Sequence, residues 1–297
     1  MNNDRIQEIL DLMEEARLDY FLISDPQSIA YCTGYYNDPH ERMFVFMISK
    51  HGNHTLFMND LFYLDHDLDV NIVWHKDGQD AIQTIVDEMH FPGRIGIDKN
   101  WASHFLLDLM KKLPDAKYIN ASPCVDLVRM KKDLQEQVLM IESSKINDAV
   151  MEEIIPFIQE GVTEKQLAKK LDELFFNHHS TCYGAIVAFG KNAADPHHEN
   201  DDTLLRKGDC VLIDMGCVYK GYCSDMTRTF FYEGILEEEI KVYEIVKKAN
   251  EAAEAMIKPG VKLSDIDKCA RKVISDEGYG KYFTHRLGHF IGRDVHE

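Results

Sequence analysis

Two aspartates in the second half of the chain have the types and spacing to hold a divalent cation. The stretch 211–231 predicts two β-strands joined by a short turn. If these strands pair about a centre between Tyr219 and Lys220, Asp214 lies directly opposite Asp225, and like charges so placed destabilise an antiparallel pair. Apolar neighbours predict that Asp214 is at least partly buried, where a bare carboxylate is costly. A positive group between the two acids is therefore expected, and carboxylate oxygens suit divalent metals.

The same two acids can also be explained without a metal. Backbone N–H groups, or the guanidinium of Arg228 on the second strand, can satisfy each carboxylate separately. From the hairpin alone, both explanations stay open.

Histidines concentrate at the C-terminal end, where they could complete such a site. Three of the 14 histidines of the chain are His285, His289 and His296. The first two share a face whether the stretch is strand or helix, because a spacing of four is close to a multiple of both periods. Gly288 and Gly292 disfavour a helix and indicate close backbone approach. A surface histidine cluster is the alternative, but together with the two aspartates these residues favour a metal site.

One more histidine precedes the hairpin. The apolar stretch 184–190 predicts a buried strand, and the turn-rich stretch 192–198 that follows it contains His197. A histidine just beyond a buried strand is well placed to line a pocket. Taken alone, an exposed turn explains this segment as well.

The elements that must position these side chains fall into two predicted domains. Strand and helix patterns alternate through the first part of the chain, which predicts an α/β layer domain over 1–125. The pattern then changes to a long helix over 134–159, and Thr163 to Gln166 has the form of a capping box that begins a second helix. We therefore place a second domain at 126–297.

Composition excludes several classes of partner. The net charge of −18 over 297 residues argues against nucleic-acid or anionic-membrane binding, which needs a basic face. The polar N-terminus does not resemble a signal peptide, and no apolar run approaches the ~20 residues of a membrane span. Seven scattered cysteines, without a Cys-x-x-Cys pair, predict neither a disulfide framework nor a thiolate zinc site. A reduced, cytoplasmic protein is expected.

The order of the motifs resembles the metallopeptidases of the pita-bread fold. They are I-D-M-G and S-D-M-T-R-T-F in the hairpin, followed by H-R-L-G-H-F-I-G-R-D-V-H-E. Within that family the chain is most similar to bacterial Xaa-Pro dipeptidases (prolidases) and Xaa-Pro aminopeptidases. Tyr31-Cys-Thr-Gly34 and the linker at Arg129 resemble the creatinase-type N-terminal domain. The resemblance covers nearly the whole chain and implies an α/β creatinase-like domain over 1–125, followed by an α+β pita-bread catalytic domain over 126–297.

The resemblance also implies a metal site. Asp214, Asp225 and His289 match metal ligands, with Asp225 bridging two divalent ions, Asp214 chelating one and His289 the other. Manganese is the metal implied first, with cobalt or zinc as alternatives. Two ions at ~3.5–4 Å can activate a bridging water and polarise a carbonyl.

Three further histidines match catalytic positions of the family. His197 corresponds to the histidine that contacts the scissile amide, and His285 and His296 correspond to substrate-binding and transition-state histidines. An imidazole near the carbonyl oxygen can stabilise the charge that develops there.

One departure from the family concerns the C-terminal side of the site. Family members continue past the last histidine motif and supply two glutamate ligands from closing strands, whereas this sequence ends at Glu297, which matches neither. Three side chains are few for two cations, and missing strands would leave sheet edges uncovered. The pita-bread domain is therefore expected to be incomplete.

The resulting hypothesis is a metal-dependent exopeptidase that cleaves Xaa-Pro bonds in short proline-containing peptides and whose activity needs the family's closing segment with the two glutamate ligands. A dipeptidase is favoured over an aminopeptidase because the N-terminal domain is short and single, and the family implies a homodimer. The alternatives are a catalytically inactive pita-bread binding module and a metal-independent creatinase-like hydrolase. The retained site residues oppose the first alternative, and the intact aspartate pair opposes the second.

Overall fold

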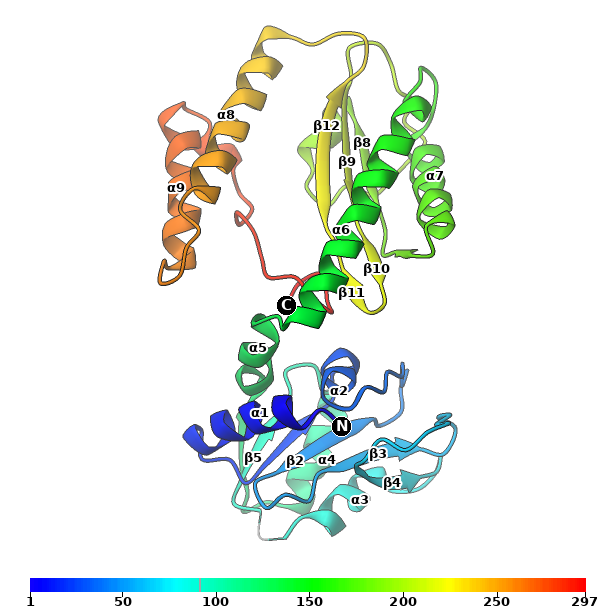
Figure 1. Cartoon of the computed structure of the whole chain (residues 1–297), viewed down its shortest axis with the longest axis vertical. Helices are drawn as coiled ribbons and strands as arrows, with labels where there is room; N and C mark the ends of the chain where they lie inside the picture. Colours follow the sequence, from blue (N-terminus) through cyan, green and yellow to red (C-terminus); the bar gives the residue numbers. More distant parts are fainter. Residues whose placement is uncertain (91) are drawn as a thin grey trace. The chain divides into compact units, whose positions relative to one another are not determined.

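A mixed six-stranded sheet forms the centre of the N-terminal half in the computed structural model, which describes residues 1–90 and 92–297. Its strand order is β4-β3-β2-β1-β5-β6 (Figure 1). The strands are β1 (Tyr20–Ile23), β2 (Val45–Ser49), β3 (Thr55–Asn59), β4 (Asn71–His75), β5 (Arg94–Ile97) and β6 (Lys117–Asn120). β2 pairs antiparallel with β1 and β3, and the other pairs are parallel.

Helices cover both faces of this sheet. They are α1 (Asn3–Glu15), α2 (Pro26–Thr33), α3 (Ala81–Glu88), α4 (Ser103–Lys112) and α5 (Ser122–Met130). α1, α2 and α5 contribute to one apolar core, and α3 and α4 to the other. Strands β1, β2 and β3 are buried along their whole length because both faces are covered. The predicted α/β layer domain is confirmed.

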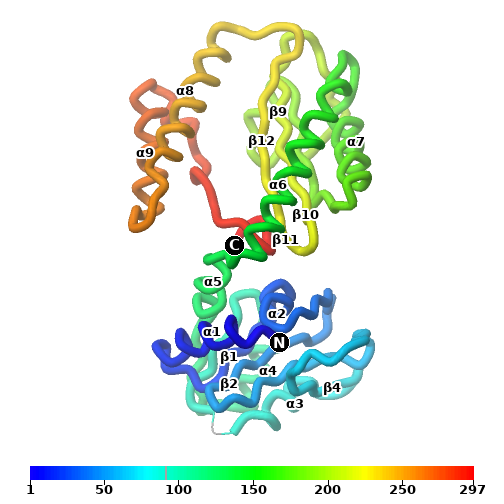
Figure 2. The backbone as a smooth tube through the Cα atoms, in the orientation of Figure 1, coloured from blue at the N-terminus to red at the C-terminus, as the bar shows by residue number. Residues whose placement is uncertain are grey.

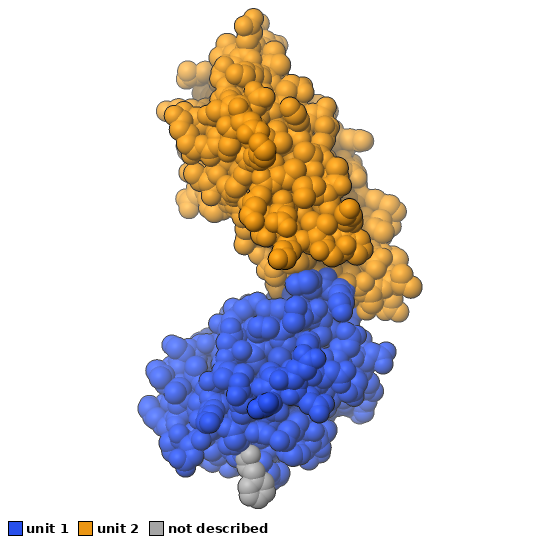
Figure 3. Space-filling model, turned by 90° about the vertical axis from the view of Figure 1, so that its left-hand side faces the viewer, with its two compact units in different colours: residues 1–131 blue, residues 132–297 orange. Residues whose placement is uncertain are grey.

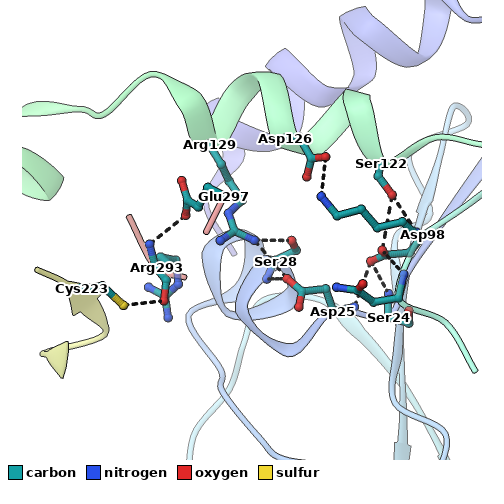
Figure 4. Close-up of polar contacts among 12 residues, drawn as sticks. Ser24, Asp25, Ser28, Asp98, Ser122, Asp126, Arg129, Cys223, Arg293 and Glu297 are labelled. Carbon is teal, nitrogen blue, oxygen red and sulfur yellow. Dashed lines mark hydrogen bonds and ion pairs between the residues drawn. The ribbon is translucent and has the colours of Figure 1, made fainter. Parts of the chain in front are cut away.

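A buried polar network joins α5 to α2 in this half. Arg129, only 5% exposed, donates hydrogen bonds to Asp25 Oδ2 at 3.0 Å and to Ser28 Oγ at 2.8 Å (Figure 4). Asp98 Oδ2 accepts from the backbone N–H groups of Ser24 and Asp25. Arg129, Asp25 and Asp98 thus have hydrogen-bond partners in this half of the chain.

The C-terminal half is built on smaller antiparallel sheets. One sheet has the order β12-β9-β8, and the other has the order β11-β10-β7. Figure 2 shows β12 beside β9, and β10 beside β11. The strands are β7 (Thr181–Cys182), β8 (Ile186–Phe189), β9 (Cys210–Met215), β10 (Cys217–Tyr219), β11 (Tyr222–Cys223) and β12 (Met226–Phe231). The helices are α6 (Leu134–Ile154), α7 (Glu164–Asn177), α8 (Glu237–Glu254) and α9 (Leu263–Asp276).

Alternation along β9 decides which face of the sheet meets the helices. Val211, Ile213 and Met215 are buried in one core with the apolar side chains of α6 and α7. Leu212 and Asp214 point to the opposite face, because successive side chains of a strand alternate. Asp214 is therefore on the face of the sheet that α6 and α7 leave open.

Helix α6 ends earlier than its sequence pattern predicts. The prediction extended it to residue 159, but the α-helix stops at Ile154 and a 3-10 turn follows over Ile155–Phe157. Pro156 lacks the amide hydrogen that would continue the helix. The predicted capping box at Thr163 is confirmed, since its side chain accepts from the N–H of Gln166.

The register of the hairpin differs from the predicted one. Tyr219 pairs with Tyr222, so the turn consists of Lys220 and Gly221. Both turn residues have positive φ, 48° and 82°, as in the type I′ turns that match strand twist. Asp214 consequently lies opposite Thr227 rather than opposite Asp225. The predicted direct pairing of the two acids is wrong, and they are diagonal neighbours along the hairpin.

The chain divides into two compact units, Met1–Lys131 and Lys132–Glu297, each with its own apolar cores (Figure 3). Within the described part of the chain, none of the helices has the length and apolarity needed to cross a membrane.

Candidate active site

A cavity of about 440 Å³ opens on the uncovered face of the β12-β9-β8 sheet. It is lined by side chains from the sheet, from the loop after β8 and from the C-terminal segment. All six side chains singled out from the sequence are among them: His197, Asp214, Asp225, His285, His289 and His296. The fold thus brings together residues that are up to 99 positions apart in the sequence, from 197 to 296.

Asp214 is half-buried in this cavity. Thr227, its cross-strand partner, donates a hydrogen bond from Oγ1 to Asp214 Oδ1 at 2.6 Å. Burial raises the pKa of Asp214, and the nearby charge of Asp225 adds to the increase, whereas the Thr227 hydrogen bond and His289 oppose it. A cation bound here would relieve both of the effects that disfavour the carboxylate.

Asp225 and His289 are in direct contact. His289 Nε2 lies 3.3 Å from Asp225 Oδ2, and the two side chains are 31% (Asp225) and 19% (His289) exposed. His289 Nδ1 lies 2.9 Å from the carbonyl oxygen of Phe290. A hydrogen bond from Nδ1 to that carbonyl leaves Nε2 as the acceptor or ligand atom, on the side that faces Asp225.

The other three histidines are exposed and surround the acids. The rings of His197 and His285 meet edge to face with centroids 6.0 Å apart. The ring of His296 lies 4.1 Å from that of His289. Partial burial and the proximity of His289 lower the pKa of His296.

The C-terminal segment has no regular secondary structure over 284–297, so the helix that Gly288 and Gly292 disfavour is indeed absent there. It runs from α9 to β11 and is bonded to the hairpin (Figure 1). The N–H of Cys223 donates to the carbonyl of Gly292 at 2.7 Å. Cys223 Sγ also lies 3.5 Å from the carbonyl oxygen of Arg293 (Figure 4). These contacts hold the histidine-bearing segment beside the strand that leads to Asp225.

Glu297 secures the end of this segment. Its carboxylate accepts from the N–H of Arg293 at 2.8 Å (Figure 4). It also pairs with Lys132 Nζ at 2.7 Å. The side chain is only 7% exposed. The sequence comparison gave Glu297 no role as a ligand, and the structure gives it a role in folding the loop that carries His296.

Tyr183 and Gly216 belong to the site but were not predicted. Tyr183 lines the cavity and donates from Oη to the carbonyl of Ser224 at 2.8 Å. A Cβ atom at Gly216 would overlap both Tyr183 Oη and the Ser224 carbonyl oxygen. Burial raises the pKa of Tyr183, and the charges of Asp225 and Asp214 add to this, so the phenol stays protonated and remains a donor. The glycine of I-D-M-G was the sequence signal for this close approach.

A second cluster of potential ligands lies behind the loop of His197. Glu164, His198 and Asp201 have donor atoms within 4.8 Å of one another, and among the described residues this is the only such group. The potential ligand atoms of Asp214, Asp225 and His289 do not all lie within 4.8 Å of one another. The cluster was not predicted, because its members come from α7 and from a loop 34 or more positions later in the sequence.

Family comparisons account for both halves of the chain. Residues 5–131 match the Creatinase/Prolidase N-terminal domain, and residues 138–297 match metallopeptidase family M24. An uncharacterized peptidase of Staphylococcus aureus is 32% identical over 302 residues, which cover 99% of this chain and 84% of that protein.

Solved structures agree with these matches. The chain is similar to a dipeptidase from Pyrococcus horikoshii OT3, with a TM-score of 0.89, 35% identity and coverage of 99% of this chain and 83% of that one. It is also similar to a prolidase from Thermococcus sibiricus, with a TM-score of 0.91, 30% identity and coverage of 100% and 83%. An Xaa-Pro dipeptidase from Bacillus anthracis matches with a TM-score of 0.88, 27% identity and coverage of 99% and 83%. The chain therefore belongs to metallopeptidase family M24: it is a peptidase with a creatinase-type N-terminal domain and a pita-bread catalytic domain.

Proposed function

We propose that this peptidase is a metal-dependent, prolidase-like exopeptidase that hydrolyses Xaa-Pro bonds in short peptides. The observation that supports the proposal is the cavity in which two carboxylates and four imidazoles converge. Membership of a metallopeptidase family implies divalent metal ions. Solved relatives described as prolidase and Xaa-Pro dipeptidase support the substrate class.

The residues present fit such ions in donor type and in electrostatics. Carboxylate and imidazole donors suit manganese, and also cobalt or zinc. Asp214, whose pKa is raised by burial and by Asp225, is the kind of acid that a cation would stabilise in its charged form. Asp214, Asp225 and His289 would hold two ions, together with further oxygen donors. When bound, such ions supply an activated water and a polarised carbonyl.

The remaining side chains have separate tasks in this proposal. His197 hydrogen-bonds the scissile amide, and His285 beside it binds the substrate. His296 donates a hydrogen bond from a ring N–H to the substrate oxygen on which negative charge develops in the transition state. Tyr183 keeps the backbone before Asp225 in place through its bond to Ser224.

Hydrolysis of Leu-Pro by the purified 297-residue chain, with and without manganese, tests the proposal. Manganese-dependent turnover that Asp214→Asn abolishes is the expected result. Absence of turnover both in this chain and in a chain extended by the closing strands of the family would contradict it and favour the binding-module alternative. Comparing Leu-Pro with Leu-Pro-Pro distinguishes a dipeptidase, which we favour, from an aminopeptidase.

We further propose that the protein works in the cytoplasm as a homodimer. All seven cysteines are free thiols, which supports a reducing compartment. The dimer is an expectation from the family resemblance. Light scattering on the purified chain measures its mass directly, and a mass near the chain's 34.3 kDa would contradict the dimer.

A further inference from the structure

The carboxylate of Glu164 is fully buried and has a complete set of hydrogen-bond donors. Its Oε1 accepts from the N–H of Phe189 at 2.8 Å and from Asn192 Nδ2 at 2.9 Å. Its Oε2 lies 2.6 Å from His198 Nε2 and accepts from the N–H of Asp201 at 3.0 Å. The side chain is 0% exposed. A buried carboxylate is tolerated only when its oxygens are paired in this way.

All four donors belong to one segment, 189–201. Phe189 ends β8, Asn192 lies in the 3-10 turn that follows, and Asp201 closes the loop. One carboxylate at the start of α7 therefore holds the beginning, the middle and the end of the loop. The loop carries His197 between the second and third of these attachment points.

His197 and His198 are adjacent in sequence and face different surroundings. His198 is 13% exposed and is paired with Glu164. His197 is exposed, lines the cavity and meets the ring of His285 at 6.0 Å. Fixing the ring of His198 fixes the backbone next to His197, and therefore limits where the His197 ring can lie.

We propose that Glu164 is a positioning residue for His197 and acts through its hydrogen bond with His198. This inference rests on the proposed function, in which His197 contacts the substrate. In the wild-type protein, the Glu164–His198 contact restrains the loop, so that the His197 imidazole is oriented before substrate binds. Such orientation contributes to the reaction rate and not only to binding.

Glu164, His198 and Asp201 have the residue types of a metal site. Their geometry instead favours the hydrogen-bonded arrangement in which Glu164 anchors the loop. An ionised carboxylate has about four lone-pair positions, and four N–H groups already point at Glu164. A cation between Glu164, His198 and Asp201 would have to displace some of these donors. The hydrogen-bonded arrangement needs no ion.

The test uses His198→Ala, His198→Gln and Glu164→Gln in the full chain. Glu173→Gln is the control, because it removes a carboxylate from an exposed position on the same helix. Loss of the anchor should lower kcat for Leu-Pro about 10- to 100-fold, with a smaller change in KM. His198→Gln, whose amide N–H can reach Glu164, should recover part of the loss. The control should match the wild type.

A second measurement makes the result independent of peptidase activity. Hydrogen exchange over 189–201 and the imidazole ¹⁵N resonances of His197 are recorded for the same variants. We expect faster exchange and shifted His197 resonances in His198→Ala and Glu164→Gln, and not in Glu173→Gln. If the wild type does not cleave Leu-Pro, the proposed function fails while these signals still decide whether the anchor exists.

Three results would overturn the inference. The first is unchanged exchange and unchanged His197 resonances in both anchor variants. The second is a shifted loop with an unchanged kcat in an active enzyme, which would make Glu164 purely structural. The third is loss of one bound manganese ion in Glu164→Gln, measured by elemental analysis, which would assign the cluster to a metal instead.

Discussion

Asp214 combines partial burial, a neighbouring acid and a single hydroxyl donor. The raised pKa means that the folded protein without metal binds this proton more tightly than the unfolded chain does. Stability of the metal-free protein should therefore fall as pH rises through the interval between the ordinary aspartate pKa of 3.8 and the raised value. Because the raised pKa comes from burial and from the charge of Asp225, this pH dependence can be tested without measuring catalysis.

Replacing Asp214 with asparagine should raise the melting temperature of the metal-free protein at pH 7. The gain should disappear well below pH 3.8, where the aspartate is protonated in both the folded and the unfolded state. Thermal unfolding at several pH values, in chelator, measures this. Asp209→Asn is the control. A melting temperature that drops at pH 7 would show that the carboxylate is satisfied without a cation.

Gly216 should not tolerate a side chain. Gly216→Ala places a methyl group against Tyr183 Oη and the backbone carbonyl of Ser224, and overpacking of this kind costs typically about 1–3 kcal/mol. Because the carbonyl cannot move away as a side chain can, adding Tyr183→Phe should recover only part of the loss. Urea denaturation measures both variants. Gly288→Ala is the matched control, since its Cβ would meet nothing within 4 Å.

At the scale of elements, α9 positions the C-terminal segment by side-chain to backbone bonds. Arg271 donates to the carbonyls of Phe283 and His285, and Asp267 accepts from the N–H of Leu287 at 2.9 Å. The Arg271 hydrogen bond, followed by the Leu287 amide, lowers the pKa of Asp267. A helix with few buried residues thus controls where His285 lies.

Asp267→Asn should loosen the segment around His285 while leaving α9 folded. A lowered pKa contributes stability that is present above the ordinary value of 3.8 and is lost as pH falls through the folded pKa. Faster hydrogen exchange over 283–289 at pH 7, relative to wild type, is the expected result. The difference should vanish in strong acid. Asp265→Asn, whose partner is the exposed Lys268, should leave exchange unchanged.

The turn of the hairpin offers another element-scale test. Lys220 has φ of 48°, and asparagine is favoured at this position of a type I′ turn followed by glycine. Lys220→Asn should therefore raise the free energy of unfolding, by about 0.5 kcal/mol or less because surface substitutions have small effects. Urea denaturation measures the change. Lys207→Asn serves as a control for loss of a surface charge, and destabilisation by Lys220→Asn would contradict the assigned turn.

At the scale of the whole molecule, two units with separate cores predict separable unfolding. Arg129 is buried in the first unit with Asp25, and removal of one partner of a buried ion pair typically costs about 3–5 kcal/mol. Arg129→Ala should lower the melting transition of the first unit and leave that of the second in place, as seen by calorimetry. Lys99→Ala breaks a more exposed pair and should change little. A single transition that shifts as a whole would show that the units unfold together.

Local patterns were enough to predict the α/β layers, the capping box at Thr163, the absence of a helix around Gly288 and Gly292, and six residues that line one cavity. These features depend on periodicity, on caps and on motifs that are contiguous in sequence. The motifs located the site residues because each motif also contains the local strand or turn residues that hold its aspartate or histidine.

Only the tertiary structure decided the register of the hairpin and the contacts that support the site. The predicted register was off because the backbone angles at Lys220 and Gly221, not the spacing of the aspartates, determine which residues pair. Glu164, Tyr183 and Asp267 were not foreseen because their partners are 20 to 41 positions away. Such pairs form when packing brings distant backbone and side-chain atoms within hydrogen-bonding distance, and no local pattern records that distance.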